Sequence, residues 1–260
     1  MAPTLFLHGG PGLSSFAERE LYGRTLAIHW WDQPRSVVMF THPFGALVEA
    51  AEDEVKTLVR ATGAPVDLVA HSFGAHIVLR LISRMPDEIG NVWLIAPIHD
   101  IGAAFVRLAT RLLQHSPSLE QLLAALLDFK AQRDHARFAR LSAQVMSFAN
   151  FFDLYWSARA DARRVWYLDL IARHSVVDAN AFEVILRDFW AEAPVSLPLP
   201  ATSAGPKAVQ VVFGRDDPSI ELEAERAAWL RLFPLATCTE ISAGHFVHLE
   251  TPASLWWRTA

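Results

Sequence analysis

Short apolar runs alternate with longer stretches of helical period over the first hundred residues and again near the end of the chain. The apolar runs cover residues 3–7, 25–31, 66–70, 92–96, 208–213 and 237–241. Most of them are too uniformly apolar to face water on either side, which is typical of parallel strands covered by helices. The pattern therefore predicts an α/β fold built on a mostly parallel, doubly wound sheet.

Helical periods lie between these runs. At 47–61 and 221–233 apolar residues recur every three or four positions, which predicts amphipathic helices with one face on the sheet. A third helical pattern begins after Ser72 and ends before Pro86.

The middle of the chain departs from this alternation. Residues 99–200 show no convincing strand, are rich in Leu, Ala, Arg and aromatic residues, and end in a proline-rich segment. Residues 197–206 are the predicted linker back to the sheet. We therefore expect three parts: the first part of an α/β core over 1–98, an inserted all-helical cap over 99–200, and the last part of the core over 201–260.

Composition and charge exclude several classes of protein. Of the 260 residues, 52% are hydrophobic and only 20% charged, so disorder is excluded. The formal net charge is −5 and no basic run alternates with aromatic residues, which argues against a nucleic-acid partner. No run approaches the ~18 apolar residues of a membrane span, and no signal-peptide core follows Met1. We expect a cytoplasmic protein with no membrane partner.

The metal-binding residue types are sparse or badly spaced. Cys238 is the single cysteine, which excludes an internal disulfide and a cysteine-based zinc cluster and fits a reducing compartment. The histidines between 99 and 174 lack the spacing of metal ligands. The sequence therefore implies no metal and no cofactor.

A serine stands between an apolar run and a helical pattern, in the segment Ala70-His-Ser72-Phe-Gly74. A serine on such a sharp turn presents its hydroxyl, and the residues two positions away on either side must be small because strand and helix backbones pass close together. Ser72 is therefore a candidate nucleophile. The alternative is an ordinary serine at a helix N-terminus.

A glycine-rich turn, His8-Gly-Gly10-Pro-Gly12, follows the first apolar run. Acyl transfer needs backbone N–H donors beside the nucleophile, and the amides of Phe73 and Gly10 are the candidates for this oxyanion hole. A plain Gly/Pro turn is the alternative.

Candidates for the catalytic base and for the acid that orients it lie near the end of the chain. Asp216 and Asp217 follow the run at 208–213, and His245 follows Gly244 after the last run. The order serine, aspartate, histidine is the one found in α/β hydrolases and differs from those of the chymotrypsin and subtilisin folds.

Four motifs together resemble the α/β-hydrolase superfamily over nearly the whole chain. They are the turn at 8–12, the Ser72 elbow at 70–74, Gly-Arg-Asp-Asp-Pro at 214–218, and Gly-His-Phe-Val-His-Leu-Glu-Thr-Pro at 244–252. The resemblance implies that Ser72 is the nucleophile, Asp217 the acid and His245 the base.

Other candidates rank lower by the same resemblance. Asp217 is preferred to Asp216 because the family's acid usually stands three residues after the glycine, and His245 is preferred to His248 because the base directly follows its glycine. His248 is expected to be a packed neighbour. Asp100 is the second-choice acid, with a helix cap as its alternative role.

Within the superfamily, the turn at 8–12 followed by residues 31–36 is similar to the proline iminopeptidase branch. The second motif is shorter here, and the elbow lacks that branch's Gly-Gly-Ser-Trp-Gly. The chain also begins almost on the strand before the turn, without the strand pair that usually precedes it. Either the sheet is shortened at its N-terminal side or the true start lies upstream.

The expected helical cap is rich in aromatic residues. Phe148, Phe152, Trp156 and Trp190 are candidates for lining a substrate pocket, and packing within the cap is their alternative role. An apolar or aromatic small-molecule substrate would fit such a cap.

The expected function is a serine hydrolase that cleaves a carboxylic ester or thioester with an apolar or aromatic acyl group through an acyl-enzyme. A serine at position 72 argues against haloalkane dehalogenase and epoxide hydrolase chemistry, since both need a carboxylate nucleophile. Three alternatives stay open: a proline iminopeptidase-like aminopeptidase, a C–C bond hydrolase, and a low-turnover acyl-transfer or binding protein on the same fold.

Overall fold

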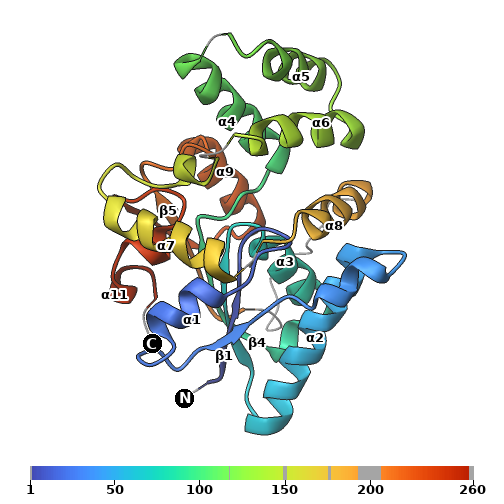
Figure 1. The fold of residues 1–260 in the computed structure, drawn as a ribbon. Coiled ribbons are helices and arrows are strands. Elements are labelled where there is room, and N and C mark those ends of the chain that lie inside the picture. Colours follow the sequence, from blue (N-terminus) through green and yellow to red (C-terminus); the bar gives the residue numbers. More distant parts are fainter. Residues whose placement is uncertain (1, 117, 149–150, 175–176, 193–205, 258–260) are drawn as a thin grey trace.

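A computed structural model describes residues 2–116, 118–148, 151–174, 177–192 and 206–257 of the chain (Figure 1). Its centre is one sheet with the strand order β2-β1-β3-β4-β5-β6, and all neighbouring strands are parallel. The strands are β1 (Thr4–Leu7), β2 (His29–Trp31), β3 (Val66–His71), β4 (Ile89–Ile95), β5 (Val209–Gly214) and β6 (Thr237–Ile241). The parallel sheet predicted from the apolar runs is confirmed.

Successive side chains along each strand enter different hydrophobic clusters. Leu5 and Leu7 of β1 belong to the larger cluster, whereas Phe6 between them belongs to a second one. In β4, Leu94 joins the larger cluster and Trp93 the second. Because strand side chains alternate between the two faces of a sheet, apolar residues at every position mean that both faces are buried.

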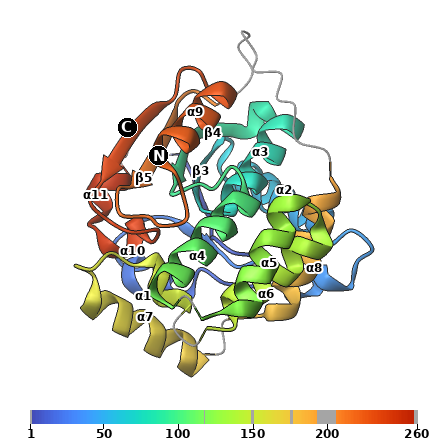
Figure 2. The same cartoon turned by 90° about the horizontal axis from the view of Figure 1, so that it is seen from above.

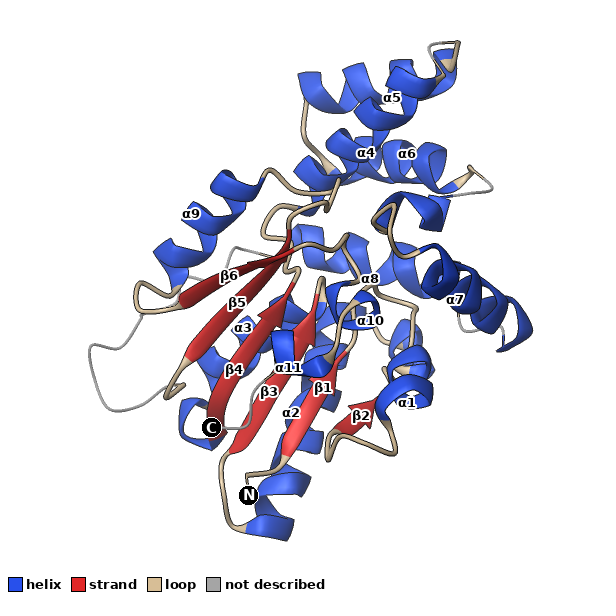
Figure 3. Cartoon of the chain, turned by 90° about the vertical axis from the view of Figure 1, so that its left-hand side faces the viewer, coloured by secondary structure: helices blue, strands red, loops and turns tan. Residues whose placement is uncertain are grey.

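Helices cover both of these faces (Figure 3). The larger cluster packs beneath α2 (Pro43–Thr62), α3 (Gly74–Arg84) and α9 (Leu222–Leu232). The second cluster includes residues of α10 (Val247–Glu250) and α11 (Ala253–Trp256), and Tyr22 of α1 (Phe16–Tyr22) packs against it. The sheet is therefore doubly wound, as predicted. Two short 3-10 turns, η1 (Arg35–Met39) and η2 (Pro86–Glu88), complete this part.

Between β4 and β5 the described residues form helices only. These are α4 (Ile101–His115), α5 (Glu120–Ala131), α6 (His135–Met146), the 3-10 turn η3 (Phe151–Tyr155), α7 (Asp161–His174) and α8 (Ala179–Ala191). Aspartates start three of them: the carboxylates of Asp100, Asp134 and Asp178 each accept a hydrogen bond from a first-turn N–H. Figure 1 shows these helices gathered over one end of the sheet, and Figure 2, seen from above, shows α4, α5, α6 and α7 in front of the strands.

The helical region is packed onto the sheet domain. Tyr167 and Leu170 of α7 share a small cluster with Phe246 and Leu249, which lie just after β6. On the other side, Asp188 of α8 accepts a hydrogen bond of 2.9 Å from the N–H of Phe44 in α2. The boundaries at 98/99 and 200/201 stay a prediction, because the predicted linker at 197–206 lies almost entirely outside the described residues.

Some elements differ in extent from the prediction. The apolar run at 25–31 forms only a three-residue edge strand, and the helix predicted at 47–61 begins earlier, with Pro43 in its first turn. Proline suits that position because its missing N–H would have no partner inside the helix. No helix within the described ranges is long and apolar enough to cross a membrane.

Candidate active site

The candidate residues meet at the carboxyl ends of the strands. Ser72 follows β3, Asp217 lies just after β5, and His245 follows β6. In a parallel α/β sheet these ends lie at one edge, where ligands bind. Residues separated by more than a hundred positions in sequence are therefore close in space.

Ser72 has a strained backbone, with φ of 51°, in the left-handed region that most non-glycine residues avoid. Its own N–H donates to the carbonyl of Ile95 at 3.0 Å, which holds the turn against β4. A Cβ at Gly74 would lie 2.4 Å from the carbonyl oxygen of Leu7, so the start of α3 passes too close to β1 for a side chain. This close approach explains the glycine of the motif.

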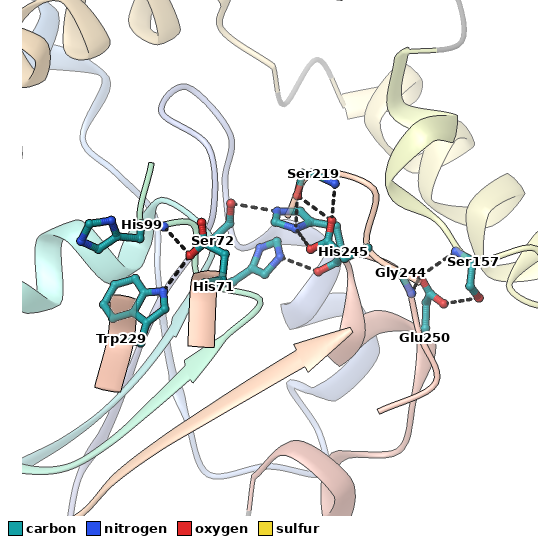
Figure 4. A network of polar contacts seen from close by, with 11 residues as sticks. His71, Ser72, His99, Ser157, Ser219, Trp229, Gly244, His245 and Glu250 are labelled. Atoms are coloured by element: carbon teal, nitrogen blue, oxygen red, sulfur yellow. Dashed lines mark hydrogen bonds and ion pairs between the residues drawn. The ribbon is translucent and has the colours of Figure 1, made fainter. Parts of the chain in front are cut away.

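One chain of hydrogen bonds joins the three residues (Figure 4). The hydroxyl of Ser72 donates to Nε2 of His245 at 2.8 Å, and Nδ1 of His245 donates to Oδ2 of Asp217 at 2.7 Å. The side chains of His245 and Asp217 are 4% and 0% exposed, so water does not compete for these bonds. Such an arrangement allows His245 to take the Ser72 proton while Asp217 fixes the ring.

Ser219 completes the surroundings of Asp217. The other carboxylate oxygen, Oδ1, accepts hydrogen bonds from the N–H of Ser219 at 2.9 Å and from its hydroxyl at 2.5 Å. Both oxygens of the buried carboxylate are thereby satisfied. Sequence reasoning missed Ser219, although a serine two residues after an aspartate is typical of a turn held by the aspartate side chain.

The lower-ranked candidates lie elsewhere. Asp216 points to Arg159 at 3.9 Å, and Asp100 caps α4 while its carboxylate binds Arg133. His248 is fully buried, and its Nε2 lies 2.8 Å from a carboxylate oxygen of Glu18. None of these three joins the Ser72–His245–Asp217 chain.

His71, next to the serine, supports the loop that carries His245. Its Nε2 donates to the carbonyl oxygen of His245 at 3.0 Å. Burial, together with the neighbouring His248 and His245, holds the pKa of His71 well below its usual value. His71 is therefore neutral and acts on the backbone of His245.

The glycine-rich turn lies beside Ser72. Gly10 has φ of 63°, which glycine adopts without strain, and a Cβ at Gly9 would lie 2.5 Å from Nδ1 of His71. Gly10 and Phe73 both border the cavity above Ser72. Within the described part of the chain, neither of their N–H groups has a hydrogen-bond partner, so both are free for an oxyanion.

We call the cavity above Ser72 the Ser72 cavity. Its volume is about 110 Å³. Its lining combines the glycine-rich turn, the elbow and the His245 loop with apolar residues of the helical region, among them Ile101, Phe105, Phe152, Phe182 and Leu186. No Asp, Glu, Lys or Arg of the described residues lines it. An uncharged, apolar group is the ligand that such walls accommodate.

Comparison with known proteins identifies the family of this chain. A model of the alpha/beta hydrolase family matches residues 4–255. The chain belongs to that family. A comparison with curated protein sequences gives no match.

Solved structures of low sequence identity share the hydrolase's fold. A thermophilic esterase from Thermogutta terrifontis has a TM-score of 0.56 at 18% identity, with 98% of this chain and 86% of the esterase covered. An N-acyl homoserine lactone degrading enzyme has a TM-score of 0.57 at 16% identity, with coverage of 98% and 90%. A 2-hydroxy-6-oxo-6-phenylhexa-2,4-dienoate hydrolase from Rhodococcus sp. strain RHA1 has a TM-score of 0.51 at 17% identity, with coverage of 96% and 86%.

The hydrolase ties its histidine loop to the helical region. The N–H of His245 donates to the carbonyl of Tyr155 at 2.7 Å. One carboxylate oxygen of Glu250 accepts hydrogen bonds from the N–H groups of Gly244 at 3.1 Å and Ser157 at 3.2 Å, and the other accepts the hydroxyl of Ser157 at 2.5 Å (Figure 4). Sequence reasoning did not predict these hydrogen bonds of Glu250, Ser157 and Tyr155, because the partners are distant in the chain.

Only one of the four aromatic residues expected to line the pocket does so. Phe152 borders the Ser72 cavity, whereas Phe148, Trp156 and Trp190 are not among its lining residues. Trp190 stacks on Phe138 with ring centroids 4.7 Å apart. Trp156 lies 4.8 Å from the ring of Phe246, and Phe148 packs against the larger cluster. These three contribute to packing, which was the alternative role.

No metal centre is formed by the described residues, among which no group of three or more His, Cys, Asp or Glu side chains is placed to hold an ion.

Proposed function

We propose that this hydrolase cleaves uncharged carboxylic esters or thioesters with an apolar or aromatic acyl group, through an acyl-enzyme on Ser72. The observation that carries the proposal is the unbroken hydrogen-bonded chain from Ser72 through His245 to Asp217, which ends at a cavity with apolar walls. A serine activated in this way attacks carbonyl carbons.

In the first half of the reaction, Oγ of Ser72 attacks the ester carbonyl carbon while Nε2 of His245 accepts the hydroxyl proton. The N–H groups of Phe73 and Gly10 donate to the oxyanion of the tetrahedral intermediate, a type of stabilisation whose loss costs on the order of a hundredfold in rate. His245 then gives its proton to the leaving alcohol or thiol as the bond to the carbonyl carbon breaks.

In the second half, a water molecule replaces the leaving group. His245 accepts one of its protons as the oxygen attacks the acyl carbon, and the proton is returned to Oγ of Ser72 when the acid leaves. Asp217 stabilises the positive charge on the ring in both halves, and Ser219 keeps that carboxylate oriented.

The charge of the cavity wall favours an ester over the two hydrolytic alternatives. A peptidase that binds a free amino terminus benefits from a carboxylate near the scissile bond, and a dienoate substrate carries a carboxylate that a cation would pair. Neither an acidic nor a cationic residue lines the Ser72 cavity among the described residues. Burying an unpaired charge there would cost several kcal/mol.

Labelling with a fluorophosphonate tests the nucleophile. We expect the intact protein to gain one adduct, because the reagent forms a stable bond only with an activated serine hydroxyl. Ser72→Ala should give no adduct, whereas Ser116→Ala, which changes an exposed serine after α4, should react like the wild type. Labelling of both variants would place the nucleophile elsewhere.

A substrate panel tests the reaction class. We expect measurable kcat/KM for aryl esters and thioesters of apolar acids, and none for proline arylamides or for a dienoate with a free carboxylate. Preferred cleavage of the arylamide would identify an aminopeptidase. A labelled Ser72 with tight ligand binding and negligible turnover on the whole panel would identify the low-turnover alternative.

A further inference from the structure

A second hollow lies on the helical region, between α4, the C-terminal part of α5 and the turn after β5. Its volume is about 650 Å³, and we call it the cationic groove. It is lined by Ala103, Val106, Arg107, Thr110, Arg111, Gln114, His115, Phe129, Lys130, Arg133 and Pro218. Among the described residues, none lines both this groove and the Ser72 cavity.

The groove is positively charged, although the chain as a whole is negatively charged. Its ionisable lining residues are all basic, while the whole chain has a formal net charge of −5. A local excess of positive charge in a concave surface attracts anions, because the walls focus the field. Because acidic residues outnumber Lys and Arg in the chain, this local cluster of basic residues does not follow from its composition.

Several of these basic side chains lack a carboxylate partner. Arg107, Arg111 and Lys130 form no ion pair within the described ranges, whereas Arg137 and Arg164 of the same helical region each bind aspartate. Arg107 and Arg111 are four residues apart on α4, where like charges repel each other. A bound anion would remove this repulsion.

Arg133 is held in place at the N-terminal end of α4. Its guanidinium lies 2.5 Å from a carboxylate oxygen of Asp100 and 5.5 Å from the centre of the Phe129 ring. A side chain fixed in this way loses little freedom when it binds a ligand. Asp100 neutralises one charge, and no carboxylate of the described residues pairs with Arg107, Arg111 or Lys130.

We propose that the cationic groove binds a small phosphate-bearing anion that carries two or more negative charges. Guanidinium groups present paired N–H donors that match the oxygens of a phosphate. The hollow is concave and large enough for more than a phosphate group, and Ala103, Val106 and Phe129 give part of its lining an apolar character. The shape therefore favours a soluble organic phosphate over the headgroups of a flat lipid surface.

The groove and the Ser72 cavity lie on different faces of α4. Ile101 and Phe105 line the cavity, whereas Ala103, Val106 and Arg107 line the groove. A ligand in the groove therefore contacts the helix that forms part of the substrate pocket. Binding there does not require an active Ser72, so it is measured independently of the proposed hydrolysis.

Calorimetric titration with pyrophosphate at low ionic strength tests the proposal. We expect saturable binding to the wild type, weakened about tenfold or more in Arg107→Ala/Arg111→Ala, because two charge-assisted contacts are lost. The matched control is Arg24→Ala/Arg60→Ala, which removes the same charge from two exposed positions outside the groove and should bind like the wild type. Equal weakening in both double variants would show only a net-charge effect and overturn the site.

Thermal unfolding without ligand separates binding from folding. We expect Arg107→Ala/Arg111→Ala to melt no lower than the wild type, because the substitution removes a repulsion, and to lose the rise in Tm that pyrophosphate gives the wild type. A lower Tm in the absence of ligand, with the pyrophosphate-induced rise retained, would assign the arginines a structural role and overturn the proposal.

Two further ligands identify the source of the phosphate. Tighter binding of a nucleoside diphosphate than of pyrophosphate would support a site for an organic phosphate, and equal affinities would support a site that contacts the phosphates alone. Co-sedimentation with phosphatidic acid vesicles, without affinity for either soluble ligand, would overturn a small-molecule site. Absence of all binding would overturn it as well.

Discussion

The carboxylate of Glu250 and the hydroxyl of Ser157 are 2.5 Å apart and connect the loop of His245 with the helical region above the Ser72 cavity. Glu250 stands at the end of α10, and Ser157 follows η3. The same carboxylate binds the N–H of Gly244, directly before His245. The position of the proposed base thus depends on a contact between two residues that are 93 positions apart in the chain.

Glu250→Ala should reduce kcat much more than it changes KM. The substitution leaves the N–H groups of Gly244 and Ser157 without their acceptor, and a shift of about 1 Å in the His245 loop costs on the order of a hundredfold in rate. Steady-state kinetics on an aryl ester gives both constants.

The conservative variant is the control for this effect. In Glu250→Gln, the amide oxygen still accepts the two N–H groups and the amide nitrogen donates to Ser157, so we expect most of the activity to return. Ser157→Ala, which removes only the hydroxyl contact, should fall between the two. A loss in Glu250→Gln as large as in Glu250→Ala would mean that the charge, rather than the hydrogen bonds to the loop, is required.

Phe152→Ala should change acyl-chain preference, whereas Trp190→Ala should not. Phe152 lines the Ser72 cavity, and shortening it leaves room for a longer acyl group. Trp190 packs on Phe138 away from the cavity, so its loss should lower the free energy of unfolding by about 2 kcal/mol. The measurements are kcat/KM over a series of esters of increasing chain length and urea unfolding. A changed chain preference in Trp190→Ala would contradict this division.

The contrast between these two residues shows what a sequence pattern can predict. Ser72, Asp217 and His245 each stand a few residues after an apolar run, so their common location followed from the parallel sheet, and the structure brings them together. Whether an aromatic residue of the helical region faces the cavity or a neighbouring helix depends on which helix lies opposite. That information is absent from a helical period, which only distinguishes a buried face from an exposed one.

The supporting contacts show the same limit. Ser219 lies two residues from Asp217 and could be inferred from local turn chemistry. Glu250 and Ser157 belong to segments whose proximity is decided by the packing of the helical region on the sheet, in which Phe246 and Tyr167 take part. The helical spacing of apolar residues predicts that the helical region packs on the sheet. It does not predict which polar groups this packing brings together.

Gly74→Ala should be severely destabilising. The added Cβ would lie 2.4 Å from the carbonyl oxygen of Leu7 and 3.0 Å from that of His8, and both are backbone atoms that cannot rotate away. Overpacking of this kind costs about 3 kcal/mol. Gly45→Ala in α2 is the control, since its Cβ would meet only His42 at an ordinary 3.6 Å, and we expect a small gain in stability. Chemical unfolding of the two variants measures the difference, and equal stabilities would contradict the close approach of α3 to β1.

The stabilising contribution of Glu225 to folding should decrease as pH rises from 5 to 8. Its carboxylate on α9 is buried, accepts the N–H of His99 at 2.9 Å and the indole N–H of Trp229 at 3.1 Å, and burial raises its pKa from 4.5 to about 7. Between these two values the folded state binds more protons than the unfolded state. The stability that this carboxyl contributes is therefore fully present below pH 4.5 and is lost as pH rises through 7.

Removing the titration tests this expectation. Glu225→Gln keeps the shape of the side chain but cannot ionise, so the stability of the wild type relative to this variant should fall by about 2 kcal/mol between pH 5 and pH 8. Urea unfolding at both pH values measures it. Glu223→Gln on the same helix is the control, because that side chain is 73% exposed and its replacement should leave the pH dependence of the wild type unchanged. A pH-independent difference between the wild type and Glu225→Gln would mean that Glu225 is ionised in the folded protein throughout this range.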